Sequence, residues 1–457
     1  MGVSPGAAAT RVLDVLQASG IEAWIVGGWV RDALLGIHGH DVDVCASGSW
    51  EENEAALAAA GIAVVESGAK FGGITAVLCG ERIEVTAYRL DGFYTDGRHP
   101  EAVQLAGSIE EDLARRDFTV NAMAWHPARG LLDLYDGRGD LERRQIRAVG
   151  DARTRFEEDA LRMLRAVRFA CRLDFRIEPA TAEALASCAP LLDAVARERV
   201  GIELDGILGT GRGGGALTRY PETMCAAVPE LARSRGFGQH SRYHVYDVYG
   251  HTARVLTAAG GLALSEGRAP SRPLMWACLL HDIAKPDTFT LDDDGNGHFY
   301  GHPELGAREA RGIMRRLSVS GDVIRDACLL IRYHDLPLKP ERASILTMMR
   351  VFSGEGVDTC RLMGELFDIK RADTLGKAPS CFYYVEDIER MRTMCESLFE
   401  SGDAYSLKTL ALKGADLIAA GVAPGRTIGD LLGRALDAHI AGKVANDRAE
   451  LLSYLGL

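Results

Sequence analysis

Two aspartates, Asp41 and Asp43, are the residues of this chain whose types and spacing point most directly to chemistry. They lie two positions apart in the β-branched segment DVDV, and a strand alternates its side chains between two faces, so both carboxylates are expected on one face. Magnesium accepts such hard oxygen ligands together with substrate phosphates, and two-metal phosphoryl chemistry uses paired carboxylates. The motif therefore predicts a magnesium site. Taken without its neighbours, the same motif could also be a pair of surface aspartates that binds no metal.

The segment before the aspartates predicts a phosphate-binding turn. Ala23–Val26 is expected to be a strand, Gly27 and Gly28 a tight turn, and residues 29–35 the start of a helix. Glycine lets the backbone approach a ligand closely, and the free N–H groups of a helix N-terminus bind anions. Arg31 lies in the first helical turn and can add charge-assisted bonds to a phosphate. If the two glycines are considered without Arg31 and the aspartates, the alternative is an ordinary turn between a strand and a helix.

Five motifs in order resemble those of the class II, bacterial-type tRNA nucleotidyltransferase and poly(A) polymerase family. They are GGWVRDALLG with DVDV, EVTAYR, DLARRDFTVNAMAW, LLDLYDGRGDL and EDALRMLRAVRFA. The resemblance is dense over roughly the first 220 residues and continues through an HD-type segment and a C-terminal tail. It implies an α/β fold with a mixed-sheet nucleotidyltransferase head, followed by an all-α neck, an HD-type body and a tail. It also implies template-independent, magnesium-dependent addition of C and A, from CTP and ATP, to the 3′ end of tRNA.

The resemblance also assigns roles to residues of the head. Arg116 is expected to contact the nucleotide phosphates, for which a planar, permanently charged guanidinium is suited. Asn121 is expected to brace the site or approach the sugar. Glu84 is expected to supply a third carboxylate from an adjacent strand, and a carboxylate there can help to activate the RNA 3′-hydroxyl. The alternative for Arg116 is an ordinary surface salt bridge. The alternative for Glu84 is an exposed glutamate on an edge strand.

The segment EDALRMLRAVRF indicates how a base is selected. Read as one helix, it places Asp159 and Arg162 on one face. Aspartate only accepts hydrogen bonds and arginine only donates them, so the pair fits cytosine and adenine and leaves guanine and uracil mismatched. The resemblance identifies this pair as the base-reading template, and an ordinary helical ion pair is the alternative. Arg165 is rotated further round, and Arg168 lies nearly opposite Asp159 on an ideal helix, which suits phosphate or RNA.

Two further segments bear on activity. Residues 90–100 are polar and glycine-rich, and in the resembled family a flexible loop here is associated with A addition, which favours complete CCA addition or A addition over CC addition alone. The second half of the chain resembles an HD phosphohydrolase domain, whose imidazoles and carboxylates suit a transition metal. Some relatives have phosphatase or 2′,3′-cyclic phosphodiesterase activity on this domain, and others use it as a scaffold for tRNA. The expected ligands are His251, His281, Asp282 and Asp373, with His302 and His334 as secondary candidates.

Composition bounds the remaining possibilities. The 457 residues suffice for two to four domains, and the absence of a long apolar run or a secretory signal indicates a cytoplasmic protein without membrane contact. Ten cysteines without a CxxC pair are expected to be reduced thiols. A net charge of −12 argues against indiscriminate nucleic-acid binding, so tRNA needs a local basic surface. Residues 143–176 offer ten arginines against five acids.

The expected domains are a head at 1–150, a neck at 151–215, a body at 216–400 and a tail at 401–457. The glycine-rich segment 209–215 is interpreted as a linker, because it does not follow a strand of a βαβ unit.

Three alternative functions remain at this point: a poly(A) polymerase or A-adding enzyme, an HD phosphohydrolase with a nucleotide-sensing head, and a protein-modifying nucleotidyltransferase. The sequence gives no indication of oligomeric state. The expected strands are Ala23–Val26, 41–45, 74–78, 82–87 and 102–105.

Overall fold

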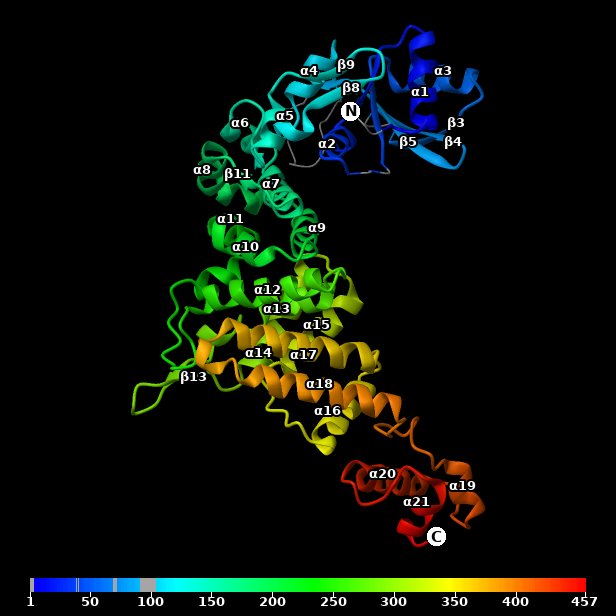
Figure 1. The fold of residues 1–457 in the computed structure, drawn as a ribbon, viewed down its shortest axis with the longest axis vertical. Coiled ribbons are helices and arrows are strands. Elements are labelled where there is room, and N and C mark those ends of the chain that lie inside the picture. The colour runs from blue at the N-terminus through cyan, green and yellow to red at the C-terminus, as the bar shows by residue number, and fades with distance from the viewer. Residues whose placement is uncertain (1–3, 38, 40, 69–71, 91–103) are drawn as a thin grey trace. The chain divides into compact units, whose positions relative to one another are not determined.

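The computed structural model describes residues 4–37, 39, 41–68, 72–90 and 104–457. The chain forms two compact units, one made of residues 1–207 and 220–227 and the other of residues 208–219 and 228–457. The first unit contains a mixed sheet followed by helices, and the second is mainly helical (Figure 1). The expected fold class is therefore confirmed.

The head is built on a seven-stranded sheet with the order β3-β4-β5-β2-β1-β8-β9. Strands β2 and β5 are parallel, whereas the other neighbouring strands of this sheet are antiparallel. The parallel pair brings residues about forty positions apart in the sequence side by side. The strands are β1 Ala23–Val26, β2 Asp43–Ala46, β3 Ala63–Gly68, β4 Gly73–Leu78, β5 Glu81–Ala87, β8 Met123–His126 and β9 Gly130–Asp133.

Most of the predicted strands are present, but some of their boundaries differ and some strands were not predicted. Strand β2 begins at Asp43, so Asp41 precedes the strand instead of belonging to it. Strands β3, β8 and β9 were not expected, since their short segments carry no clear alternation. Two short strands, β6 (Arg89–Leu90) and β7 (Gln104–Leu105), pair with each other. The predicted loop at 90–100 lies, beyond residue 90, outside the described residues.

Helices cover both faces of the head sheet. On one face pack α1 (Ala7–Ala18) and α3 (Trp50–Ala59), which contact strands β3 to β5 and each other. On the other face, α4 (Ile109–Ala114) joins a buried cluster that includes Cys45 and Val26. Helix α2 (Gly28–Leu34) follows β1 directly, so the glycine turn lies at the end of a central strand.

The rest of the first unit is helical except for β10 (Gln145–Ile146) and β11 (Arg176–Ile177), which pair in parallel. The segment expected to be one helix from residue 158 onward is broken. Asp159 has an extended backbone (φ −145°, ψ 102°) and separates two helices. The helices are α5 Gly137–Glu142, α6 Ala152–Glu158, α7 Leu161–Leu173, α8 Pro179–Cys188, α9 Arg197–Leu208 and α11 Pro221–Ala227.

The second unit is organised around α12 (Val248–Ser265), which packs against α13 (Arg272–Leu280) and α17 (Thr359–Gly376). The linker interpretation of residues 209–215 was wrong in part, because Gly213–Arg219 forms α10 and packs on α12. Strands β12 (Thr290–Leu291) and β13 (Gly297–His298) form a small hairpin. The remaining helices are α14 His302–Arg316, α15 Gly321–Tyr333, α16 Arg342–Gly354, α18 Tyr384–Glu400, α19 Gly414–Ala419, α20 Arg426–Ile440 and α21 Arg448–Leu455.

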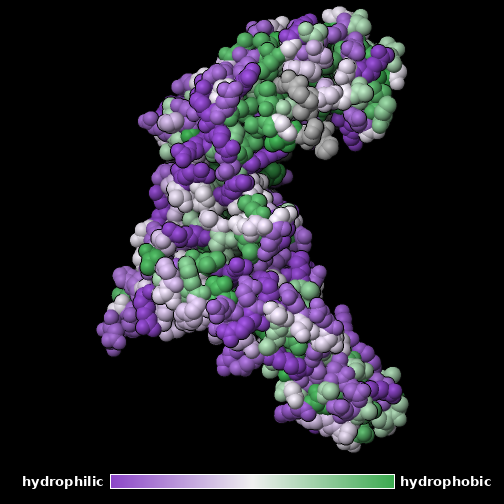
Figure 2. Space-filling view, in the orientation of Figure 1, coloured by the Kyte–Doolittle hydropathy of each residue, from purple (hydrophilic) through white to green (hydrophobic). Residues whose placement is uncertain are grey.

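The second unit presents a largely hydrophilic face in Figure 2, where purple residues predominate over its helices. Among the residues that the structure describes, every helix is too short or too polar to cross a bilayer.

Candidate functional site

Two carboxylates of the head lie side by side because of the strand register. The parallel pairing of β2 and β5 places Asp43 opposite Glu84, so both side chains leave the same face of the sheet, as expected for Glu84. Both line a cavity of about 520 Å³ in the first unit. Burial and the negative charge of Glu84 raise the pKa of Asp43 to about 6, against the opposing effect of Arg116. Asp41 is exposed and raises the pKa of Asp43 further. The cluster is thus short of positive charge, which a divalent cation can supply.

The turn between β1 and α2 brings backbone close to an arginine. Gly27 has a positive φ of 70°, and a Cβ atom there would lie 3.1 Å from a guanidinium nitrogen of Arg116. The buried carboxylate of Asp112 holds Arg116 at 2.8 Å and Arg115 at 2.5 Å. Burial acts to raise the pKa of Asp112, but the two arginines outweigh it and lower that pKa. Gly27, Gly28 and Arg116 all line the cavity, so the predicted phosphate site has a fixed guanidinium beside its turn.

Arg31 is anchored inside the head. Its side chain is almost fully buried, and its Nη1 donates a hydrogen bond to Asn121 Oδ1 at 2.6 Å. Its Nε donates to Asp32 Oδ1 at 2.7 Å, and its guanidinium lies over the Phe169 ring. Asn121 in turn donates to Asp117 Oδ1 at 3.2 Å. Arg31 and Asn121 both line the cavity, where their hydrogen bond holds the two side chains together.

The two residues expected to read the base lie in the same cavity, but not as a helical pair. Asp159 precedes α7, and its Oδ2 accepts a hydrogen bond from Arg199 at 3.0 Å. Arg162 donates to Glu158 Oε2 at 2.7 Å and to the Arg115 carbonyl at 3.1 Å. The expected i, i+3 arrangement on one helix was therefore wrong. Extended backbone at Asp159, instead of helical periodicity, sets where its carboxylate points.

The break before α7 also changes the expected position of Arg168. Because Asp159 lies outside the helix, Arg168 lines the same cavity as Asp159 instead of lying opposite it, and Arg165 lines that cavity as well. Arg165 Nε donates to Asp117 at 2.9 Å, and Arg168 Nε donates to Glu203 at 2.6 Å. Burial acts to lower the pKa of Arg165, and Asp117 and Glu203 outweigh it and raise that pKa. Acidic side chains thus hold both guanidiniums at the cavity wall.

Several residues that line this cavity, or that anchor its arginines from behind, were not identified from the sequence. Arg199 and Glu203 lie on α9, about forty residues after the base-reading segment, and no motif marks them. Glu158 stands directly before Asp159, and the adjacent acidic pair was the one available signal. Asp112 and Asp117 flank the Arg115–Arg116 pair in the sequence, yet only the structure reveals that they fix guanidiniums of the cavity.

The arginine-rich segment 143–176 is largely ion-paired. Nine of its ten arginines lie within 4.0 Å of a carboxylate. Several of these pairs are exposed, including Arg144 with Asp174 and Arg153 with Glu157. Exposed ion pairs contribute little free energy, so such arginines can exchange a carboxylate for a phosphate at small cost.

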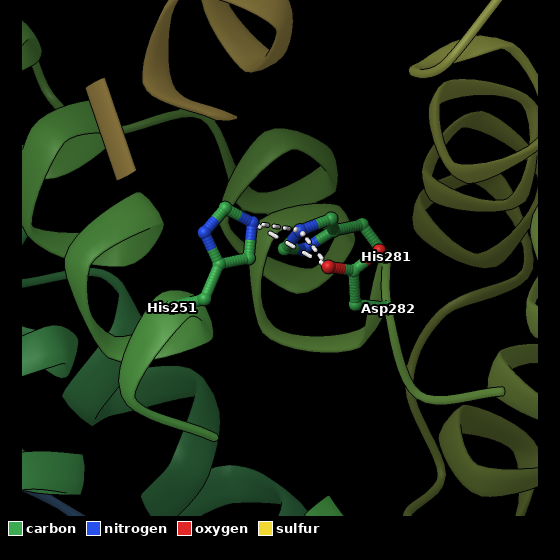
Figure 3. Close-up of side chains that lie close together, drawn as sticks. All are labelled: His251, His281 and Asp282. Atoms are coloured by element: carbon green, nitrogen blue, oxygen red, sulfur yellow. Dashed lines mark hydrogen bonds and ion pairs between the residues drawn. The ribbon is translucent and has the colours of Figure 1, made fainter. Parts of the chain in front are cut away.

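A second cluster of polar side chains is buried in the second unit. Figure 3 shows His251 of α12 directed toward His281 and Asp282, which follow the C-terminal end of α13. The Nε2 atoms of His251 and His281 are 3.3 Å apart, and they lie 3.4 and 3.2 Å from Asp282 Oδ2. Asp373 Oδ1 of α17 lies 3.0 Å from His251 Nε2. The structure thus brings together the four expected ligands, and three of them form a group able to hold a metal ion.

Backbone carbonyls orient the imidazoles of this cluster. His251 Nδ1 lies 3.1 Å from the Gly376 carbonyl, and His281 Nδ1 lies 2.9 Å from the Cys278 carbonyl. Because a carbonyl oxygen can only accept a hydrogen bond, Nδ1 carries the proton in each ring and Nε2 keeps its lone pair toward the cluster. This is the tautomer that a metal ligand needs.

Three segments of the chain match known families. Residues 23–147 match the poly A polymerase head domain, residues 174–232 match the probable RNA- and SrmB-binding site of polymerase A, and residues 248–375 match the HD domain. The order of these segments agrees with a sheet-containing head, a helical neck and a helical body.

The relatives that match this chain are named CCA-adding enzymes. The CCA-adding enzyme of Streptococcus mutans is 30% identical over 448 residues, which are 98% of this chain and 96% of that enzyme. The CCA-adding enzyme of Streptococcus suis is 44% identical over 200 residues, 44% of this chain and 49% of that enzyme. The crystal structure of the Bacillus stearothermophilus CCA-adding enzyme in complex with CTP has 28% identity and a TM-score of 0.71, covering 99% of this chain and 97% of that one. Because the first match spans both chains almost completely, this chain belongs to the family of CCA-adding enzymes.

Proposed function

We propose that this chain adds C and A, from CTP and ATP, to the 3′ end of tRNA without a nucleic-acid template, and that the cavity of the first unit is the active site. One observation carries the proposal: carboxylates, guanidiniums and the Asp159–Arg162 pair line a single cavity of about 520 Å³. A nucleoside triphosphate needs these three environments at once, for its metal ions, its phosphates and its base. The CTP complex of the Bacillus stearothermophilus relative supports the assignment.

The transfer step requires positioning and charge neutralisation. The 3′-oxygen of the RNA attacks the α-phosphorus, the bond to the pyrophosphate oxygen breaks, and the hydroxyl proton passes to a carboxylate of the site. Asp41 and Asp43 would hold magnesium, which neutralises phosphate charge and lowers the pKa of the attacking hydroxyl. Glu84 faces Asp43 across the strand pair and is the nearest further carboxylate by register. Arg116, fixed by Asp112, would contact the phosphates beside the glycine turn.

Base selection follows from the fixed donor and acceptor. Cytosine and adenine both present an amino donor beside a ring-nitrogen acceptor, which Asp159 and Arg162 complement. Guanine and uracil present the reverse order and would leave buried polar groups unpaired. Glu158 and Arg199 hold the two side chains in the cavity before a nucleotide enters, so the template is largely preformed.

The second unit would hold a transition-metal ion on His251, His281, Asp282 and Asp373. Asp282 is buried, and its Oδ1 completes no hydrogen bond among the described residues, which fits an ion as its partner. Its Oδ2 lies 2.7 Å from Lys285 Nζ. Imidazole with carboxylate is a donor set of transition metals. Such an ion supplies an activated water for phosphate-ester hydrolysis or a rigid joint between helices. Asp373 is also paired with Lys377 at 2.6 Å.

Variants of neighbouring carboxylates test the active site. Asp41→Ala and Glu84→Gln are expected to abolish or strongly reduce labelled-nucleotide incorporation into tRNA while the circular dichroism spectrum stays unchanged. Glu81→Gln is the matched control, since Glu81 is an exposed acid of the same strand as Glu84. Incorporation by Asp41→Ala at the level of the unaltered protein would contradict the assignment.

A further inference from the structure

The second unit exposes a tyrosine whose ring is nevertheless held in one orientation. Tyr300 follows β13 and is 76% exposed. Its ring lies parallel to the His298 ring, with 6° between the two planes and 5.3 Å between the centroids. Its hydroxyl lies 3.3 Å from His298 Nδ1, and His298 Nε2 lies 3.0 Å from Asp292 Oδ2. The hairpin of β12 and β13, which stands out from the helices of the second unit in Figure 1, thus carries a flat aromatic surface that faces solvent.

A second exposed tyrosine lines the same cavity as Tyr300. Tyr243 precedes α12 and is 44% exposed, and both tyrosines line a cavity of about 610 Å³. The backbone of Tyr243 is anchored, because its carbonyl accepts a hydrogen bond from the Ala378 N–H at 2.8 Å. Pockets for small ligands typically measure about 300–1,000 Å³. Two aromatic rings from separate segments therefore border a space of suitable size for a small ligand with a planar group.

An arginine beside Tyr243 adds a positive charge to the lining. The Arg242 guanidinium lies 4.9 Å from the centre of the Tyr243 ring, and its Nη2 donates to the Tyr243 hydroxyl at 2.7 Å. Within the described part of the chain, no carboxylate lies within 4.0 Å of this guanidinium. The two lysines of the lining, by contrast, are each held by a buried aspartate, at 2.7 and 2.6 Å. Arg242 is therefore the lining cation that is available to a phosphate.

A carboxylate of the lining can serve as a hydrogen-bond acceptor for a ligand. Asp335 is exposed and lines the cavity, and none of the described cationic side chains lies within 4.0 Å of it. A carboxylate only accepts hydrogen bonds, which suits a ribose hydroxyl. Asp292 is already engaged, since it accepts a hydrogen bond from the Asn296 N–H at 2.7 Å and pairs with His298. The cavity thus combines aromatic rings, a guanidinium and an acceptor.

We propose that this cavity of the second unit binds a nucleoside phosphate, with the base stacked against Tyr300 and Tyr243 and the phosphate held by Arg242. The ligand is a free nucleotide or the end of a single-stranded RNA, which share this chemistry. Every base has a π-face, so stacking on an aromatic ring tolerates all four bases. The site is distinct from the cavity of the first unit, where Asp159 and Arg162 are proposed to reject guanine and uracil. It also uses none of the proposed metal ligands.

Binding of guanosine 5′-monophosphate (GMP) to the full chain tests the proposal without any nucleotide transfer. Guanine is used because the base-reading pair of the head is expected to reject it. In equilibrium dialysis with labelled GMP, Tyr300→Ala is expected to weaken binding roughly 5- to 100-fold, the usual loss for one base–aromatic stack. Tyr300→Phe keeps the ring and should retain binding. Tyr454→Ala is the matched control, because Tyr454 is a 44% exposed tyrosine of α21 that lies outside the cavity lining.

The parts of the ligand are tested separately. Arg242→Gln should weaken the binding of GMP and hardly change that of guanosine, which has no phosphate. Ribose 5-phosphate should displace GMP poorly, because it has no base to stack. Displacement by ribose 5-phosphate at the same concentration as by unlabelled GMP would contradict base stacking.

Competition also identifies the source of the ligand. A short single-stranded RNA that ends in guanosine should displace labelled GMP more strongly than free GMP does if the natural ligand is an RNA end, and less strongly if it is a free nucleotide. No GMP binding, or binding that Tyr300→Ala and Tyr243→Ala both leave unchanged, would overturn the proposal. Neither result would affect CCA addition by the head, which is measured by incorporation into tRNA.

Discussion

Asp43 is a carboxylate of the head whose pKa is raised by both burial and charge. In the metal-free chain, burial and Glu84 raise its pKa from 3.8 to about 6. The raised pKa means that the folded state favours the protonated carboxyl. The stability that the protonated Asp43 carboxyl contributes to the folded state is fully present below the unfolded pKa of about 4 and is lost as the pH rises through about 6.

Asp43→Asn should therefore raise the metal-free chain's free energy of unfolding by up to about 3 kcal/mol at pH 7.5 and by less than about 1 kcal/mol at pH 4, since one pKa unit corresponds to about 1.4 kcal/mol. Urea unfolding at the two pH values measures the difference. The same gain at both pH values would contradict the electrostatic explanation, and magnesium should reduce the advantage of the variant at pH 7.5.

Asp159 is the better residue for testing base selection, because Arg162 also anchors Glu158 and the Arg115 carbonyl. Asp159→Ala removes the acceptor for the amino group of cytosine or adenine. The loss of about 1.5–3 kcal/mol for a charged hydrogen bond predicts that the preference for CTP over UTP falls roughly 10- to 100-fold.

Single-nucleotide incorporation with each of the four triphosphates measures that preference. Glu157→Ala is the control, because Glu157 is exposed on the neighbouring helix and its nearest ion pair is a weak one with Arg153. A selectivity pattern that Asp159→Ala leaves unaltered would refute the template.

At the level of elements, the sequence predicted the helices and strands that depend on neighbouring residues. The strand Ala23–Val26 and the helix after Gly27 follow from β-branched residues and a glycine turn, and both are present. The pairing of Asp43 with Glu84 depends on a parallel register between distant segments, which the sequence does not encode locally. The break at Asp159 escaped prediction because the residues on both sides of it favour helix, and contacts of Asp159 with Leu161 and Arg199 stabilise the extended backbone.

Two adjacent glycines of α12 give a matched test of how the second unit packs. A Cβ atom at Gly260 would lie 1.9 Å from the Gly211 carbonyl oxygen, whereas nothing lies within 4 Å of one at Gly261. Gly260→Ala should reduce the free energy of unfolding by about 1–3 kcal/mol through overpacking. Gly261→Ala should be neutral or stabilise by up to about 1 kcal/mol, as helix propensity favours alanine. Thermal unfolding compares them, and similar values for both would mean that the close contact between Gly211 and α12 is wrong.

On the scale of the whole molecule, an acidic chain has to bind an anionic RNA. The net charge of −12 opposes approach, so binding depends on local arginines whose exposed ion pairs are weak. We expect tRNA affinity to fall steeply with salt, and Arg144→Ala to reduce the slope of log affinity against log salt by about 1. Filter binding at several salt concentrations measures the slope, with Arg11→Ala, an exposed arginine of α1, as the control. Affinity that does not change with salt would exclude this neck surface.

The acidic anchors show what composition alone could not resolve in this segment. Counting arginines in residues 143–176 predicted a local basic surface, and Asp117, Glu158 and Glu203 hold three of these arginines at the wall of the cavity. Which arginine pairs with which carboxylate is a property of tertiary packing. The motifs therefore identified many of the residues of the cavity, whereas Arg199 and the division of the arginines between cavity and surface needed the fold.

The central claim, CCA addition by the head, is tested most directly by supplying tRNA transcripts that end before CCA, after C and after CC. With magnesium, CTP and ATP, the account predicts two C and then one A on the first transcript, completion of the other two, and no use of GTP or UTP. A long A tail on many RNAs, or a single A only on the CC-ended transcript, would contradict complete CCA addition. No incorporation on any transcript would refute the head as a nucleotidyltransferase.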